Sequence, residues 1–142
     1  MFSRSAGYAV QALTYLAEQP PGKLAGAREI AMATRIPMPF LWKILRHLSR
    51  KKLVRSFKGV RGGYELARSA ERISVEQILQ AAQNHEHFRP CIFGLQTCDE
   101  QCPCPLHDSW IAIRRDLDRL LATTTLAALA KRSKPSRRRK SS

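Results

Sequence analysis

Along the first fifty residues, apolar positions recur at steps of three and four, and this spacing predicts helices. A first helix of about 14 residues is expected to be capped by Ser5 and to end before Pro20, and a short helix follows over 27–33. Pro37 can start a third helix but cannot continue the second. The third helix is expected to bury one apolar face, made of Leu41, Ile44, Leu45 and Leu48.

Two short strand-like runs, 53–57 and 64–66, flank a turn rich in glycine and basic residues, and this pattern predicts a β-hairpin. The glycines at 59, 62 and 63 allow positive φ and a close approach to a sugar-phosphate backbone. Lys58 and Arg61 at the tip can reach phosphates or a minor groove. We therefore predict a mainly α fold with a small β-hairpin wing, a winged helix-turn-helix whose basic third helix suits the major groove.

The second half of the chain is expected to be built around another short helix and one long helix. Ser74 can cap a helix over 75–83, whereas 84–105 shows no periodicity. Trp110, Ile113, Leu117 and Leu121 then form an apolar seam, which predicts dimerisation through a long helix; the alternative is an amphipathic helix docked on its own domain. A terminal turn over 126–131 follows. We thus expect four parts: a winged helix-turn-helix domain over 1–83, a cysteine-rich loop over 84–106, a dimerisation helix and terminal turn over 107–131, and a disordered basic tail over 132–142.

The charge of the chain is unevenly distributed. Its 142 residues carry 25 Lys and Arg against 11 Asp and Glu, a net charge of +14. Residues 1–65 hold 12 basic and 3 acidic residues, 66–130 hold 6 and 8, and 131–142 hold 7 and none. Positive charge concentrated in one structural half and in a tail is typical of a protein that binds a polyanion such as double-stranded DNA, because neutralised phosphates release counterions. The other interpretation is a merely soluble basic surface.

Four cysteines lie within fourteen residues, at Cys91, Cys98, Cys102 and Cys104, and His107 follows. Thiolates and an imidazole so close together indicate a metal or cluster site. No window is apolar enough for a membrane span and the N-terminus does not read as a signal peptide, so we expect a cytoplasmic protein in which disulfides are disfavoured. Three alternatives to a cluster sensor stay open: a structural zinc site using the four cysteines, a metal-free thiol redox switch, and a small iron-sulfur electron carrier.

No nucleophile–base pairing and no phosphate-cradling glycine loop stands out, so the pattern favours a regulator over an enzyme. The candidates for DNA contact lie on the third helix and the wing. They are Pro39, Phe40, Trp42, Lys43, Arg46, Arg50, Lys58 and Arg61.

Several of these runs together resemble the Rrf-two (Rrf2) family of bacterial winged-helix regulators. The runs are Tyr8-Ala9-Val10-x-Ala12-Leu13, Phe40-Leu41-x-x-Ile44-Leu45-x-x-Leu48, Gly62-Gly63-Tyr64-x-Leu66, and Cys104-x-x-His107 before a tryptophan. The chain is most similar to the branch typified by the iron-sulfur cluster regulator, a homodimeric transcription factor. The resemblance implies a DNA-binding repressor of palindromic operators that is controlled by iron, oxidative or nitrosative status.

The same resemblance implies that Cys91, Cys98, Cys104 and His107 hold a 2Fe-2S cluster, with Cys102 as an additional thiol and possible ligand. The nitric-oxide-sensing branch is similar too, but its 4Fe-4S cluster takes an aspartate near the N-terminus as a ligand. The first sixteen residues here contain no acidic residue. The resemblance therefore favours 2Fe-2S over 4Fe-4S.

Overall fold

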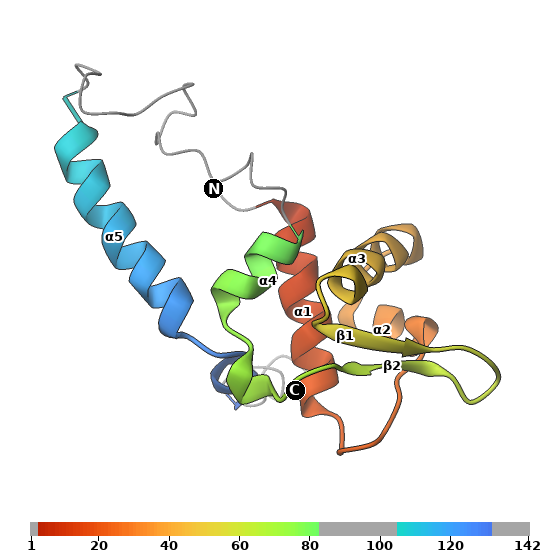
Figure 1. Ribbon diagram of the computed structural model, residues 1–142. Helices are drawn as coiled ribbons and strands as arrows, with labels where there is room; N and C mark the ends of the chain where they lie inside the picture. The colour runs from red at the N-terminus through yellow and green to blue at the C-terminus, as the bar shows by residue number, and fades with distance from the viewer. Residues whose placement is uncertain (1–2, 83–104, 132–142) are drawn as a thin grey trace, which may run out of the picture.

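The computed structural model describes residues 3–82 and 105–131. Helices α1 (Arg4–Glu18), α2 (Ala27–Thr34) and α3 (Met38–Arg50) are followed by an antiparallel hairpin of β1 (Val54–Phe57) and β2 (Gly63–Leu66) (Figure 1). A short 3-10 turn, η1 (Ala70–Arg72), leads into α4 (Val75–Ala82), and α5 (His107–Thr123) lies beyond the undescribed 83–104 segment. The predicted mainly α fold with a hairpin wing is confirmed.

The first three helices pack around one apolar core. The four residues predicted to form the buried face of α3 are all buried, and they meet Leu13 of α1 and Ile30 of α2. The predicted cap of α1 was wrong. Ser3 takes this position, since its Oγ accepts a hydrogen bond from the backbone N–H of Ala6, whereas Ser5 lies inside the helix. Propensity alone does not distinguish two serines that are two residues apart.

The hairpin is tied to the helices by a short backbone bridge. The N–H of Tyr64 donates to the carbonyl of Ala25 at 2.8 Å, and the N–H of Ala25 donates back to Tyr64 at 3.0 Å. A Cβ on Gly63, whose φ is +153°, would lie 2.9 Å from the carbonyl oxygen of Ala25. Glycine at this position therefore lets β2 approach the segment before α2 closely.

Helix α4 starts at the predicted cap. The Oγ of Ser74 accepts from the N–H of Gln77 at 3.2 Å, and the side chain of Gln77 accepts from the N–H of Ser74 at 3.0 Å, so the two residues form a capping box. The chain after α5 returns to this point. The N–H of Leu126 donates to the carbonyl of Ile73, and the Leu126 side chain is fully buried in the main core.

Helix α5 meets the rest of the protein near its C-terminal end, while its N-terminal end extends away from the other helices (Figure 1). Leu121 packs with Ala6 and Leu79, and Leu117 lies against the same cluster. Ile113 stays 57% exposed. The predicted seam is therefore divided. Trp110 and Leu121 are buried and Leu117 packs on the protomer, so Ile113 alone of the four predicted residues is exposed, and the neighbouring Leu120 is exposed as well.

Two predicted features fall outside the described residues. These are the segment that carries all four cysteines and the basic tail over 132–142. Among the helices that the structure describes, none combines the length and apolar character that a membrane crossing requires.

Candidate nucleic-acid interface

The outer side of α3 carries most of the residues predicted to contact DNA. Pro39, Lys43, Arg46 and Arg50 follow one another at steps of four, three and four, so they form one stripe along the helix, and all four are exposed. Trp42 flanks this stripe with 55% of its surface exposed. The stripe points outward because the apolar residues of α3 occupy the opposite face and are fixed in the core.

Phe40, at the start of the same helix, has a second role. Its ring lies 6.2 Å from the ring of Tyr8, centroid to centroid, with the planes tilted by 56°. Aromatic pairs favour such tilted arrangements. Phe40 is 48% exposed, so it presents part of its ring outward while it links the start of α3 to α1.

The wing presents Lys58 and Arg61 in the turn between β1 and β2, and both side chains are exposed. The N–H of Gly62 donates to the carbonyl of Gly59 at 3.0 Å and closes the turn. Gly59 has a φ of +103°, which favours glycine. Val60, between the two cations, is fully exposed. The turn is therefore a narrow tip that places positive charge well away from the core.

The positive charge of this surface is not neutralised by the residues that the structure describes. From 30 to 64 the sequence contains nine basic residues and no acidic one. One of the nine, Arg55, has its Nη2 atom 3.3 Å from the Oε1 of Glu65. The five cations predicted to contact DNA form no ion pair within the described ranges. Such a surface attracts polyanions and orients them before contact.

Sequence reasoning missed Arg35, which lies in the turn between α2 and α3. Its φ of +61° ends α2 in the left-handed conformation, and its side chain is exposed. Glycine or asparagine is the usual residue at this position, so an arginine there is unusual, and the sequence alone shows it. The absence of acidic residues from 30 to 64 was the other available signal. Arg35 adds a cation beside α3, the recognition helix of the helix-turn-helix.

His107, the one predicted cluster ligand that the structure describes, is the first residue of α5 and is partly buried. The predicted cysteine ligands lie outside the described residues. Among residues 3–82 and 105–131, no three His, Cys, Asp or Glu side chains come together as a metal site. The site geometry that the structure describes is therefore that of α3 and the wing.

Two helices joined by a short turn, an exposed basic stripe on the second, and a basic hairpin beside it define a winged helix-turn-helix DNA-binding protein. The family model described as iron-dependent transcriptional regulator, Rrf2, matches residues 2–132. The chain belongs to the Rrf2 family and is a DNA-binding transcriptional regulator.

An HTH-type transcriptional regulator of Aquifex aeolicus is 32% identical over 131 residues, which cover 91% of this chain and 90% of that protein. Two solved structures share the fold at 23% identity. CymR, the global cysteine regulator of B. subtilis, has a TM-score of 0.77 and covers 92% of this chain and 96% of its own. IscR of T. potens has a TM-score of 0.75, with coverages of 96% and 90%.

Proposed function

We propose that this regulator controls its operator binding through an iron-sulfur cluster held by Cys91, Cys98, Cys104 and His107. The observation that carries the proposal is the donor set: four cysteines within fourteen residues, with His107 three positions after the last of them. Three thiolates and one imidazole fit an iron-sulfur cluster, in which histidine in place of cysteine raises the reduction potential. When bound, such a cluster supplies a centre that is sensitive to oxidants, nitric oxide and iron supply.

The position of His107 gives this donor set a connection to the DNA-contacting surface. Cys104 is within three residues of His107, so their Cα atoms are at most about 11 Å apart. His107 begins α5, and Leu121, fourteen residues later, packs with Ala6 of α1 and Leu79 of α4. A rigid helix of that length spans about 21 Å. Ligation at His107 would therefore act on one end of a helix whose other end contacts α1.

Helix α1 in turn packs against the recognition helix. Contacts join α1 to α3 and to α4, and Leu13 of α1 lies in the same core as Leu41 and Leu45. A cluster-dependent change in the position of α5 would thus reach α3 through packed side chains. This is the basis for proposing that cluster status changes operator affinity.

We further propose that the protein acts as a homodimer on a palindromic operator. Leu106, Ile113 and Leu120 are 45%, 57% and 59% exposed and recur every seven residues. These three side chains share one exposed face of α5, at the seven-residue spacing of a coiled-coil position, whereas Trp110 is buried and Leu117 packs within the protomer. A second copy of α5 could cover this seam and set the spacing of the two recognition helices.

Replacing one exposed apolar residue of α5 by aspartate tests the proposed dimer. Ile113→Asp should convert the protein to monomers in analytical ultracentrifugation, because the new charge would be buried between two helices. Ala122→Asp adds the same carboxylate to an exposed position on the opposite side of α5 and should leave the dimer intact. A dimeric Ile113→Asp protein would refute this seam.

The salt dependence of DNA binding tests the contact residues. Arg46→Ala and Lys58→Ala should each reduce the slope of log K against log salt by about 0.9 per subunit, the value for one lost phosphate contact. Arg119→Ala removes an exposed cation of α5 and serves as the charge-matched control. If Arg46→Ala and Lys58→Ala had the same slope as Arg119→Ala and the native protein, Arg46 and Lys58 would not be part of the DNA interface.

The cluster itself is tested by the visible absorption spectrum of anaerobically purified protein, with iron, zinc and acid-labile sulfide measured on the same sample. We expect iron, matching sulfide and charge-transfer bands. Cys104→Ala should lose them, whereas Cys102→Ala should keep them. Stoichiometric zinc that is lost in Cys102→Ala would favour a four-cysteine zinc site instead. No metal after attempted reconstitution, with DNA binding lost on oxidation and restored by reductant, would favour a thiol switch.

The control of DNA binding is tested separately. Cys91→Ala protein, which should carry no cluster, should differ from the native holoprotein in operator affinity or selectivity. Unchanged affinity and selectivity for every operator would refute the coupling and leave the winged-helix regulator standing.

A further inference from the structure

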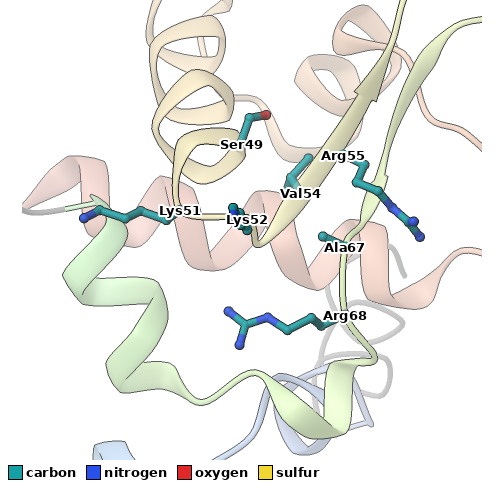
Figure 2. Close-up of a pocket in the computed structure, with 7 residues that line it drawn as sticks. All are labelled: Ser49, Lys51, Lys52, Val54, Arg55, Ala67 and Arg68. Carbon is teal, nitrogen blue, oxygen red and sulfur yellow. The ribbon is translucent and has the colours of Figure 1, made fainter.

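A hollow of about 710 Å³ opens where α3 ends and β1 begins, and it extends to the residues that follow β2 (Figure 2). Lys51, Lys52 and Arg68 line it, and Figure 2 shows the side chain of Arg68 directed from the end of β2 toward α4. A smaller adjoining hollow of about 150 Å³ shares Lys51 and Arg68 and is also lined by Gln77 and Gln80 of α4. Cations from two separate segments therefore line the same space.

Arg68 has an unmet hydrogen-bonding requirement in this space. Its Nε atom is buried and has no hydrogen-bond partner among the described residues. A buried charged donor without an acceptor is costly, so native structures usually supply one. The guanidinium group matches the paired oxygens of phosphate and carboxylate groups. The missing partner of Arg68 is therefore expected to be an oxyanion.

Lys52 is held at the edge of the hollow in a conformation that lysine disfavours. Its φ is +60°. The N–H of Leu53 donates to the carbonyl of Leu48, and the N–H of Lys52 donates to Ser49, so α3 ends in a Schellman motif with Lys52 at the position usually taken by glycine. Strained residues of this kind cluster at binding sites.

The charge of the hollow is uncompensated within the described part of the chain. Arg55 also lines it but is paired with Glu65 at 3.3 Å. Lys51, Lys52 and Arg68 form no ion pair there, and no acidic residue lines either hollow. Cations near a helix C-terminus do complement the helix dipole, which explains Lys51. That effect does not explain Arg68, which follows β2, the second strand of the hairpin.

We propose that this hollow binds a small phosphorylated molecule, with Arg68 on the phosphate and Lys51 and Lys52 supplying positive charge at the edges of the hollow. Its volume exceeds what a phosphate group alone needs and falls within the range of small-molecule sites, and Val54 and Ala67 offer apolar surface for an organic body. The hollow lies at the end of the hairpin opposite the turn that carries Lys58 and Arg61. We assign the phosphate to a free ligand, and the salt slope of DNA binding distinguishes this source from the DNA backbone.

Phenyl phosphate serves as the probe, with benzyl alcohol as a neutral aromatic control, and both are added to the full chain at constant ionic strength. At ten times its dissociation constant, phenyl phosphate should raise the melting temperature of the native protein by about 4 °C, because a ligand that binds only the folded state stabilises it. Arg68→Gln should bind it at least tenfold more weakly in isothermal titration calorimetry. Arg119→Ala, which removes an exposed cation elsewhere, should bind it as the native protein does.

Lys52→Gly provides a second variant that should fold without difficulty, since glycine accepts the positive φ. It should weaken phenyl phosphate binding several-fold. Three results would overturn the proposal: equal shifts with benzyl alcohol, no shift with 10 mM phenyl phosphate, or native binding by Lys52→Gly. A reduced salt slope of DNA binding in Arg68→Gln would also overturn it, because it would assign Arg68 to the DNA backbone.

Discussion

Gly62 in the wing offers a sharp test of how the hairpin turn presents its cations. A Cβ placed on Gly62 would lie 2.0 Å from the carbonyl oxygen of Phe57, where real Cβ atoms essentially never come within 3.0 Å. In Gly62→Ala protein the two strands must separate by about 1 Å or more at this point. That shift should weaken two interactions most: the hydrogen bond from Gly62 to Gly59, and the pairing of Phe57 with Gly63.

The expected effect on DNA binding follows from the two cations in the turn. If Lys58 and Arg61 each neutralise one phosphate, displacement of the turn should reduce the salt slope by about 1.8 per subunit, twice the value for one contact. The free energy of unfolding should fall by only about 1–3 kcal/mol, the cost of local strain, because the turn lies outside the core. The variant should therefore fold and bind DNA more weakly and with less salt dependence.

Fluorescence anisotropy titrations at four or more salt concentrations measure the slope, and thermal unfolding measures the stability. Gly7→Ala is the matched control: a Cβ there meets nothing within 4 Å, and alanine should stabilise α1 by up to about 1 kcal/mol. A Gly62→Ala protein with a native slope would show that the turn does not contact phosphates, or that it adapts without moving its cations.

Three further substitutions test the fold. Leu126→Ala should cost about 2–5 kcal/mol in chemical denaturation, because the side chain is fully buried in the main core; a loss below 1 kcal/mol would contradict that anchoring. Ser74→Ala should cost about 1 kcal/mol through loss of the α4 cap, and Ser74→Asp should recover most of it. Arg55→Gln should cost about 1 kcal/mol or less, since the Arg55 side chain in its ion pair with Glu65 is 59% exposed, and a larger loss would mean that the pair stabilises the hairpin more than surface pairs do.

Local patterns predicted the helix-turn-helix and the wing because each is encoded by neighbouring residues. The spacing of Leu41, Ile44, Leu45 and Leu48 identified the buried face of α3, and the exposed stripe followed as its complement. The glycines at 59, 62 and 63 identified the hairpin turn, and Ser74 identified the start of α4. These signals depend on backbone preferences that act over a few residues.

The division of α5 between internal packing and an exposed seam could not be predicted in the same way. Leu120 and Leu121 are adjacent and chemically identical, yet Leu121 packs on Ala6 and Leu79 while Leu120 is exposed. Which of them is covered depends on how α5 is rotated against α1 and α4, and that rotation is set by contacts between residues more than forty positions apart. Helical periodicity fixes the spacing of a stripe but not the direction in which it points.

By itself, the sequence determined that this protein has a basic helix-turn-helix, a basic wing and four closely spaced cysteines followed by a histidine, since each is encoded in contiguous residue types and spacings. The tertiary structure decided which cations share a surface. It left the predicted cations of α3 and the wing exposed. It also placed Arg68, Lys51 and Lys52 around one hollow, which no local sequence pattern reveals. The reason is physical: side-chain chemistry is local, whereas the convergence of charges depends on how the elements pack around a common core.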